Sequence, residues 1–344
     1  MAGCIGFDIG GANIKAAHSE GLAQSDGAAY SIPFPLWQSP EKLSGELQRL
    51  LDRLPAADSL AVTMTGELAD CYATKADGIA HILSAMQSIA DSRPIHVWST
   101  AGEFVTVEQA SEKPLSVAAA NWYAVATWWG QTKQVESGLL IDIGSTTTDM
   151  IPIRNRKPAT QGLTDVTRLH AGELFYTGVS RTPICAVVHQ VPFRGEMVPV
   201  AAEWFSTTLD IALLLDEIPD APEDCDTANH RPATRDGAWD RLARQICCDR
   251  TECPIEEAVG IAQYVREQQL AQLHFSLEKV LARHSNVAFS EVLLSGSGRD
   301  LARRMLSNFP VLNDASIIDL GEILNPSLAS AACAYAVAKL CESG

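Results

Sequence analysis

Several features that would assign a protein to a large functional class are absent from this sequence. No apolar run approaches the roughly 20 residues that cross a bilayer, and the first ten residues lack the basic and apolar regions of a secretory signal. We therefore predict a cytoplasmic protein with no membrane partner. A surplus of positive charge is also missing, because the formal net charge is −16. Phosphate backbones need clustered Lys and Arg, so we expect no nucleic-acid partner.

The nine cysteines form no disulfide framework and no zinc pattern. Only Cys247, Cys248 and Cys253 cluster, and they have neither a second ligand pair nor a closely spaced His pair beside them. Scattered cysteines in odd number indicate reduced thiols. The rest of the composition is that of a globular protein, with 47% hydrophobic and 20% charged residues. A length of 344 residues predicts two domains.

The sequence does contain a repeated strand, turn and strand. A short apolar run ends in Asp8-Ile9-Gly10-Gly11, and a second predicted strand follows over residues 13–18. Residues 138–153 repeat this arrangement around Asp142-Ile143-Gly144. A turn-bearing hairpin that recurs at domain-scale spacing indicates two α/β domains of related topology. We expect Asp8 and Asp142 to face each other across a cleft.

Both turns carry groups that suit a phosphorylated ligand and its metal ion. Glycines let the backbone come close and present N–H groups to phosphate oxygens. Two carboxylates suit Mg²⁺, which needs few protein ligands, and Lys15 would offset phosphate charge. We predict Asp8 and Asp142 as metal ligands and a phosphate-binding set of Gly10, Gly11, Asn13, Gly144, Ser145, Thr146 and Thr147.

A third small-residue turn follows the predicted strand at residues 291–294. Its residues Ser295, Gly296 and Gly298 would lie against a phosphate or a flat group, although the turn alone is only a loop. In this order the three turns resemble the phosphate 1, phosphate 2 and adenosine motifs of the actin/hexokinase/Hsp70 superfamily. The resemblance implies a two-domain, ribonuclease H-like fold with an interdomain cleft. We place the first domain at residues 1–115 plus 325–344 and the second at 116–324.

Longer strings resemble one family within that superfamily. The matching segments are residues 6–15, 64–70, 142–149, 172–179 and 231–235. They are similar to the hydantoinase/oxoprolinase-related proteins of tetrahydromethanopterin-linked one-carbon metabolism, which act in methanofuran biosynthesis in methanogens. The resemblance implies a transferase that joins an aminomethyl-furylmethyl diphosphate to the phenol of γ-glutamyltyramine and releases diphosphate. Its ligands would be small-molecule diphosphate and phenolic substrates with Mg²⁺. ATP stays open and is not required.

The implied reaction gives roles to further residues. Lys15 would neutralise the leaving diphosphate, and the phenol needs a base, for which Glu67 and Asp149 are candidates. A loop near residues 172–178 and a polar stretch at 219–235 are expected to hold substrate, because arginines clamp carboxylates and phosphates. The predicted substrate-binding residues are Arg168, Glu173, Tyr176, Arg231 and Arg235.

Plainer interpretations stand beside these roles. Glu67 also fits a helix N-terminus, and the loop near residue 173 could be held by its own salt bridges. The polar stretch 219–235 also fits a solvated loop. For the whole chain, an ATP-dependent kinase or ATPase and a non-catalytic sensor or scaffold are the alternatives. The sequence leaves a homo-oligomer open.

Hydrophobic spacing predicts the remaining elements. Strands are expected at 60–64 and 95–98, and helices at 43–54, 121–129, 204–215, 256–284, 300–306 and from Asn325-Pro326 to about residue 340. Asn121 is expected to cap its helix, and Trp122, Trp128 and Trp129 to pack in the core.

Overall fold

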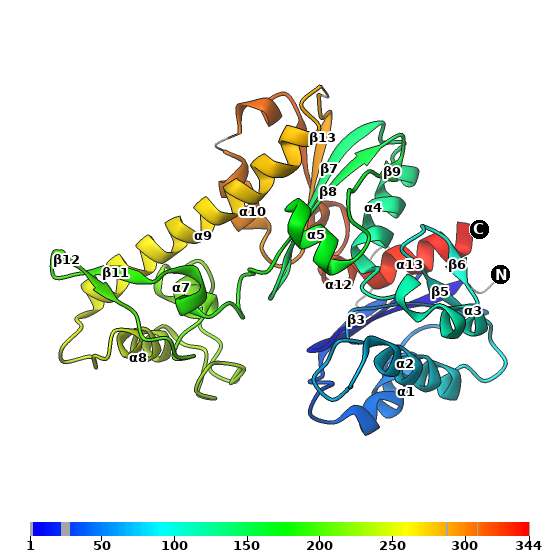
Figure 1. Cartoon of the computed structure of the whole chain (residues 1–344). Helices are drawn as coiled ribbons and strands as arrows, with labels where there is room; N and C mark the ends of the chain where they lie inside the picture. The colour runs from blue at the N-terminus through cyan, green and yellow to red at the C-terminus, as the bar shows by residue number, and fades with distance from the viewer. Residues whose placement is uncertain (1–2, 22–27, 287, 308, 344) are drawn as a thin grey trace.

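A computed structural model describes residues 3–21, 28–286, 288–307 and 309–343 of the chain. It consists of two sheet-and-helix domains with a third, smaller lobe projecting from the second domain (Figure 1). No helix within these ranges combines the length and apolarity needed to cross a bilayer.

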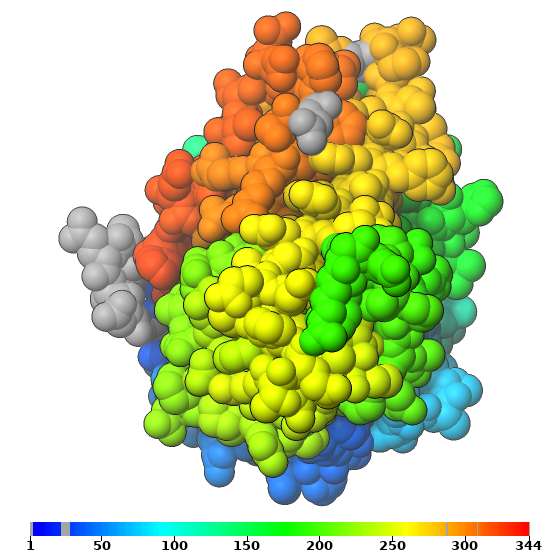
Figure 2. All heavy atoms as spheres, turned by 90° about the vertical axis from the view of Figure 1, so that its left-hand side faces the viewer, coloured from blue at the N-terminus to red at the C-terminus, as the bar shows by residue number. Residues whose placement is uncertain are grey.

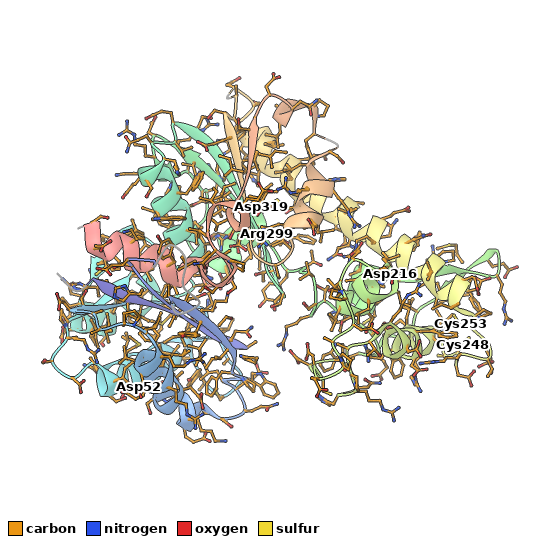
Figure 3. The ribbon with its side chains drawn as sticks, turned by 180° about the vertical axis from the view of Figure 1, so that it is seen from behind. Asp52, Asp216, Cys248, Cys253, Arg299 and Asp319 are labelled. Carbon is orange, nitrogen blue, oxygen red and sulfur yellow. The ribbon has the colours of Figure 1, made fainter. Side chains whose placement is uncertain are left out.

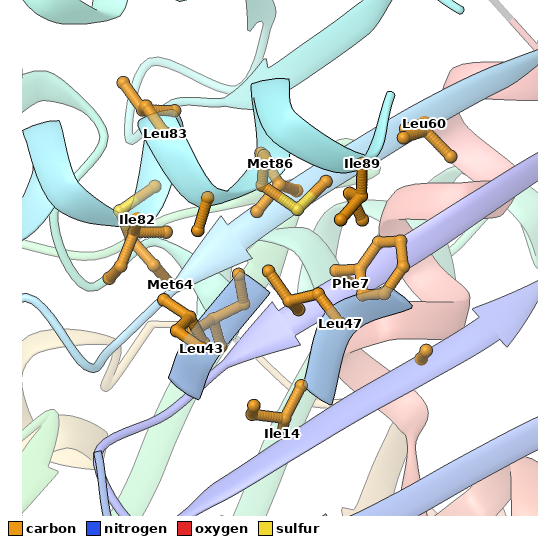
Figure 4. Packing of buried hydrophobic residues seen from close by; sticks show 14 of the residues in the cluster. Phe7, Ile14, Leu43, Leu47, Leu60, Met64, Ile82, Leu83, Met86 and Ile89 are labelled. Carbon is orange, nitrogen blue, oxygen red and sulfur yellow. The ribbon is translucent and has the colours of Figure 1, made fainter. Parts of the chain in front are cut away.

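The first domain is built on a sheet in the order β3-β2-β1-β4-β5-β6. Its strands are β1 (Cys4–Ile9), β2 (Asn13–His18), β3 (Ala29–Pro33), β4 (Ser59–Met64), β5 (Ile95–Trp98) and β6 (Phe104–Val105). The central strand β1 is buried along its whole length, and its side chains alternate between two faces. Ile5, Phe7 and Ile9 pack in the core with α1 (Leu43–Arg53) and α2 (Lys75–Ile89). Figure 4 shows Phe7 among side chains of both helices.

The second sheet repeats the start of the first. Its order is β10-β8-β7-β13-β14, with β9 paired to β8. Its strands are β7 (Ser137–Ile143), β8 (Thr148–Arg154), β9 (Lys157–Pro158), β10 (Leu174–Phe175), β13 (Glu291–Ser295) and β14 (Ser316–Asp319). In both domains a hairpin, β1-β2 or β7-β8, is extended by a parallel strand on its first member, β4 or β13. The predicted duplication of strand, Asp-x-Gly turn and strand is therefore confirmed.

Two helices fill the space between the sheets. The last helix α13 (Ala332–Ser343) returns to the first sheet and packs on β1 and β4, while α4 (Asn121–Thr132) packs on β8 and β9. The two helices also contact each other. A Cβ atom on Gly6 would lie 2.0 Å from the carbonyl oxygen of Ala334, so only glycine lets α13 lie this close to β1. The tryptophans of α4 are buried, as predicted.

Residues between β10 and the middle of α9 (Ile255–Arg283) form the third lobe, which has its own hydrophobic core. It contains β11 (Gln190–Phe193), β12 (Glu196–Pro199), α6 (Ile184–Val187), α7 (Thr208–Leu214) and α8 (Arg235–Gln245). Figure 2 looks onto this lobe, in green and yellow, with the first domain in blue below it. Cys248 and Cys253 lie in the lobe (Figure 3), between α8 and α9, and all nine cysteines are free. The division into two domains did not foresee the lobe.

The remaining helices are α3 (Val107–Glu112), α5 (Asp165–Ala171), α10 (Arg299–Leu306), α11 (Leu320–Ile323) and α12 (Pro326–Ser330). Three details of the predicted helices are wrong. The helix expected from residue 204 begins at Thr208, after an exposed Trp204. Asn121 is the first residue of α4 and not its cap. The C-terminal helix is interrupted at Ala331, where α13 turns to follow the first sheet.

Candidate active site between the two domains

The two Asp-x-Gly turns have the same geometry. The Gly10 N–H donates to the carbonyl oxygen of Asn13 at 2.9 Å, and the Gly144 N–H donates to that of Thr147 at the same distance. The bonds close equivalent tight turns directly after Asp8 and Asp142. A Cβ atom on Gly11 would meet no atom within 4 Å, so this turn is open on one side.

Each turn is held by the residues that follow a neighbouring strand: β4, which is parallel to β1, and β13, which is parallel to β7. The Gly66 N–H donates to Ile9 O at 2.9 Å in the first domain, and the Gly298 N–H donates to Ile143 O at 2.8 Å in the second. A Cβ atom on Gly296, whose φ is +82°, would lie 2.2 Å from Ile143 O. These glycines are therefore required for packing of the third turn on the second. Because packing alone accounts for these glycines, their presence is not evidence for a nucleotide-binding site.

Arg299, which directly follows the third turn, holds that turn through contacts with Gly296 and Asp319. The Arg299 guanidinium donates to the Gly296 carbonyl oxygen and lies 2.8 Å from Asp319, the last residue of β14. Figure 3 labels this pair below the second sheet. Arg303 also lies 2.9 Å from the same carboxylate. Ser295, Gly296 and Gly298 thus form a turn fixed by internal contacts, beside Asp142 in the sheet register.

Asp8, Lys15 and Asp142 form the charged centre of the site. The Lys15 Nζ lies 4.0 Å from Asp8 Oδ2, and Asp8 is only 5% exposed. Burial raises the pKa of Asp8, an effect that the Lys15 charge partly offsets. Burial and then the Asp149 charge raise the pKa of Asp142 to about 6, while Lys15 lowers it. The net pKa of Lys15 is raised because Asp8 and Asp142 outweigh its own burial.

The two hairpins have the same strand register, but the residue that faces the turn aspartate has the opposite charge in each. Lys15 faces Asp8 across the first hairpin, and Asp149 faces Asp142 across the second. Asp149 is in turn paired with Arg168, whose guanidinium lies 3.9 Å from the ring centre of Trp122. Burial raises the pKa of Asp149 and Arg168 lowers it. Among the described residues, the cluster therefore contains three acidic groups, with Lys15 beside Asp8 and Arg168 beside Asp149.

Several polar groups at the site have no partner in the described part of the chain. The N–H groups of Gly11, Ala12, Ser145 and Thr146 make no hydrogen bond there. Oδ1 of Asp8 and the hydroxyl oxygens of Thr63 and Ser295 are buried without a partner as well. Buried polar side-chain atoms are rarely left unpaired, so the orphaned oxygens beside the turns mark a candidate ligand site, and the free N–H groups of the turns suit an anion.

The donor set fits Mg²⁺ held jointly with a phosphate. Asp8 and Asp142 supply hard carboxylate oxygens, and Asp8 has one oxygen without a partner. Among the described residues no three His, Cys, Asp or Glu side chains converge on one point. That part of the chain thus contains no metal site whose ligands are all protein side chains. Mg²⁺ does not need one, because it keeps several waters and binds one or two carboxylates plus substrate phosphates.

Glu67, which the sequence offered as a candidate base, lies at the edge of the first turn. Its side chain is 1% exposed, its Oε1 lies 3.9 Å from Lys75 Nζ, and its Oε2 has no partner. Burial raises the pKa of Glu67 to about 7, and Lys75 limits the rise. The start of α2 fixes this position, since a Cβ on Gly78 would lie 2.3 Å from Glu67 O. Glu67 is therefore better placed as a base than Asp149, because Arg168 donates a direct hydrogen bond to Asp149, whereas Lys75 lies 3.9 Å from Glu67.

Two of the predicted substrate-binding residues, Arg168 and Glu173, are buried and bonded within the protein. Arg168 is 1% exposed and holds Asp149. Glu173 is equally buried, and its carboxylate accepts the N–H groups of Gln161 at 2.6 Å and Gly162 at 3.1 Å. All of these contacts lie within the protein. Both side chains are thus engaged by the protein itself, where sequence reasoning had expected them to be available to a substrate.

The other three predicted substrate-binding residues lie at the surface. Tyr176 is exposed next to the segment that clamps the second turn. Arg231 is exposed in the polar stretch, which is a loop as predicted as far as residue 234, apart from an isolated bridge between Ala221 and Ala233. Its last predicted residue, Arg235, instead begins α8 and lies 3.3 Å from Asp216. Arg235 lines a hollow of about 420 Å³ on the third lobe with residues 216–220, and Figure 3 labels Asp216 there. This hollow is lined only by lobe residues.

Sequence reasoning missed Cys333. This thiol is buried at the start of α13. Burial raises its pKa, and the charges of Asp8 and Asp142 raise it further. No local motif marks Cys333, because it reaches the site only when the C-terminal helix packs back on the first sheet.

Comparisons with known proteins agree with this architecture. A nucleotide-free acetone carboxylase structure matches with a TM-score of 0.53 and 9% identity over 98% of this chain and 70% of that chain. A ROK family glucokinase from Streptomyces griseus matches with a TM-score of 0.47 and 12% identity over 99% of both chains. The former similarity supports the fold alone. With the sheet topology, it confirms the predicted actin/hexokinase/Hsp70-like two-domain fold.

The sequence comparisons decide the family. The hydantoinase/oxoprolinase family profile matches residues 58–339. This chain belongs to the hydantoinase/oxoprolinase family. Within that family, the (4-{4-[2-(gamma-L-glutamylamino)ethyl]phenoxymethyl}furan-2-yl)methanamine synthase of Methanocaldococcus jannaschii is 31% identical over 98% of this chain and 96% of its own. A protein of the same name from Methanococcus vannielii is 30% identical over 59% of this chain and 89% of its own. The resemblance predicted from the motif segments is confirmed, and these relatives are named as enzymes.

Proposed function

We propose that this hydantoinase/oxoprolinase family protein is a Mg²⁺-dependent transferase of methanofuran-type cofactor synthesis. It would join an aminomethyl-furylmethyl diphosphate to a tyramine-type phenol such as γ-glutamyltyramine. The observation that carries the proposal is the pairing of two open Asp-Gly turns around Asp8, Asp142 and Lys15. Their unpartnered N–H groups suit an anion, and the synthase relatives share nearly the whole length of the chain.

The reaction needs a stabilised leaving group. As the bond between the furylmethyl carbon and the diphosphate oxygen breaks, negative charge collects on the diphosphate. Lys15 and the unpartnered N–H groups of both turns would receive that charge. Mg²⁺ on Asp8 and Asp142 would supply further charge neutralisation when bound. Prearranged charges of this kind act most strongly where water is excluded, and Asp8 is buried.

The reaction also needs an acceptor made nucleophilic. The phenolic oxygen forms the new bond to the furylmethyl carbon, and its proton passes to Glu67 Oε2, the carboxylate oxygen without a partner. A pKa of about 7 leaves Glu67 partly ionised at neutral pH and able to hold a proton. Atoms balance as one aryl ether, one diphosphate and one proton held by Glu67.

The third lobe would hold the far end of the phenolic substrate. Arg181 joins the lobe to the second turn, since its N–H donates to Ser145 O at 2.9 Å and its guanidinium lies 3.9 Å from Asp226 in the polar loop. The polar loop continues to the exposed Arg231. A guanidinium there suits a carboxylate such as that of a glutamyl group.

The test is a turnover measurement with the purified protein. Mg²⁺, the aminomethyl-furylmethyl diphosphate and γ-glutamyltyramine are supplied without ATP, and both diphosphate and the ether are quantified. The proposal predicts equal amounts of the two products. A parallel reaction replaces the furylmethyl diphosphate with ATP. ADP formed there, with no ether in the first reaction, would assign a kinase or ATPase instead.

A further inference from the structure

An ion pair joins the two domains directly beside Glu67. Lys75 is the first residue of α2 in the first domain, and Asp165 is the first residue of α5, which packs on β10 in the second. Figure 1 shows the two helices in separate domains. The Lys75 Nζ lies 3.1 Å from Asp165 Oδ2 and 3.9 Å from Glu67 Oε1. One ammonium group is therefore shared between a buried carboxylate of one domain and a partly exposed carboxylate of the other.

Hydrogen-bonded helix caps fix the backbone on both sides of this ion pair. Thr74 caps α2 by accepting the Asp77 N–H at 3.2 Å, and Thr164 caps α5 within a capping box. Each charged side chain thus begins a helix whose start is fixed. The linker that crosses from the first domain to α4 passes close to Glu67 and holds Ala119 at φ +46°, a strained value for a residue with a Cβ.

We propose that Lys75 and Asp165 are positioning residues that link the charge of Glu67 to the contact between the two domains. When the domains meet, Asp165 draws Lys75 partly away from Glu67, so the carboxylate is left without a full counter-ion and stays basic. When they separate, Lys75 is free to pair with Glu67 alone. The inference deepens the proposed function, because it explains how the base would become active only over a closed site.

The charges predict opposite effects for the two partners. The charged side chains that act on the Glu67 carboxyl are Lys75 from α2, which lowers its pKa, and Asp165 from α5, which raises it. Asp165→Asn should therefore lower the pKa of Glu67, since Lys75 is then released to it. Lys75→Met should raise that pKa. Neighbouring charges at these distances shift a pKa by about 1 unit or more.

The direct test is a titration of Glu67 that does not depend on turnover. Carboxyl ¹³C NMR of glutamate-labelled protein, compared with Glu67→Gln to assign the signal, gives the Glu67 midpoint in each variant. We expect a midpoint lower by about 1 pH unit in Asp165→Asn and higher by about 1 pH unit in Lys75→Met. Lys75→Arg, which keeps the charge, should return the midpoint toward that of the original protein. Because the titration needs no substrate, its outcome does not depend on the identity of the substrates.

The controls are an aspartate and a lysine without such a partner. Asp300 lies exposed in the first turn of α10, and Lys113 is exposed at the end of α3. Asp300→Asn and Lys113→Met should leave the Glu67 midpoint unchanged. Shifts of the same sign in Asp165→Asn and Lys75→Met, or none in either, would overturn the proposal. In the transferase assay, the acidic limb of kcat/KM should move with the NMR midpoint. Absence of turnover with the NMR shifts intact would count against the proposed reaction alone.

Discussion

At the scale of single residues, the site depends on an imbalance of charge. Asp142 lies within electrostatic reach of Asp8 and Asp149, yet among the described residues Lys15 is the cation that acts on both Asp8 and Asp142, while Arg168 is paired with Asp149. The equivalent position of the second hairpin holds an acid in place of the lysine. Burial makes ionised carboxylates costly unless they are paired. A bound cation would remove this cost, and the diphosphate would bring the negative charge that Lys15 and the turns then neutralise.

Removing the charge of either turn aspartate should abolish most turnover without unfolding the protein. We expect Asp8→Asn and Asp142→Asn each to lower kcat by about 100-fold or more, because each would remove a proposed Mg²⁺ ligand. Thermal unfolding should change little or shift upward, since a buried charge is lost. Asp52→Asn on α1 is the matched control, because that exposed side chain accepts a hydrogen bond from Gln48 at 2.7 Å, away from both turns. Equal kcat in all three variants would remove both aspartates from the mechanism.

Glu67 should give the pH dependence of both rate and stability. A base works when it is ionised, so kcat/KM should rise with pH through about 7, the pKa that burial gives Glu67. Stability should follow the opposite course. The folded state holds the proton more tightly than the unfolded state, so stability falls as pH rises from the ordinary carboxyl range to about 7, by up to about 3 kcal/mol.

Glu67→Gln separates these effects. The variant should lose the acidic limb of the rate profile and most of its turnover. It should also lose part of the stability decline, measured by urea unfolding at pH 5 and pH 8. An unchanged acidic limb in Glu67→Gln would assign the base to another group.

At the scale of elements, the segment after β10 fixes the second turn. A Cβ on Gly178 would lie 2.5 Å from Gly144 O and from the backbone atoms of Ser145 and Thr146. The carbonyl oxygen of Gly178 also accepts hydrogen bonds from Thr208 at 2.9 Å and Gln269 at 3.0 Å. The second turn is therefore held through this glycine by α7 and α9. Movement of the third lobe would be transmitted to the turn along these bonds.

Gly178→Ala should accordingly damage stability and substrate binding together. The added methyl group meets backbone, which cannot rotate away, so we expect a loss of about 1–3 kcal/mol in unfolding free energy and a raised KM for the diphosphate substrate. Gly260→Ala on α9 is the control. A Cβ there meets nothing within 4 Å, so alanine should gain roughly 0.5–1 kcal/mol. Equal stability of the two variants would show that the turn is not tightly clamped.

The sequence predicted the parts of this site that are local. Asp8 and Asp142 follow apolar strands and precede glycines, so their place at the turns could be read directly. Arg168 and Glu173 look like surface side chains of a loop, and only tertiary packing shows that they are buried. Cys333 and Asp165 lie far along the chain from their partners, and their roles arise where the C-terminal helix and the second domain meet the first. The third lobe was missed because its helices are short and its core is formed from scattered residues.

At the scale of the whole molecule, the fold places one duplicated hairpin in each domain and two helices between them. The C-terminal helix packs on the first sheet and contacts α4 of the second. The described part of the chain also contains an ion pair across the domains, Lys75 to Asp165 at 3.1 Å. A ligand that contacts both turns would hold the two domains together. The acidic chain can bind such an anion only through these local donors and a metal ion, since its net charge is −16.

The central claim is that the two turns together form a site for diphosphate with Mg²⁺. Isothermal titration calorimetry of inorganic diphosphate tests it directly, with and without Mg²⁺ and against ATP. The account predicts one site per chain that requires Mg²⁺, is lost in the Asp8→Asn/Asp142→Asn double variant and is retained in Asp52→Asn. Diphosphate binding that is equally tight in the double variant, or binding of ATP without binding of diphosphate, would contradict it.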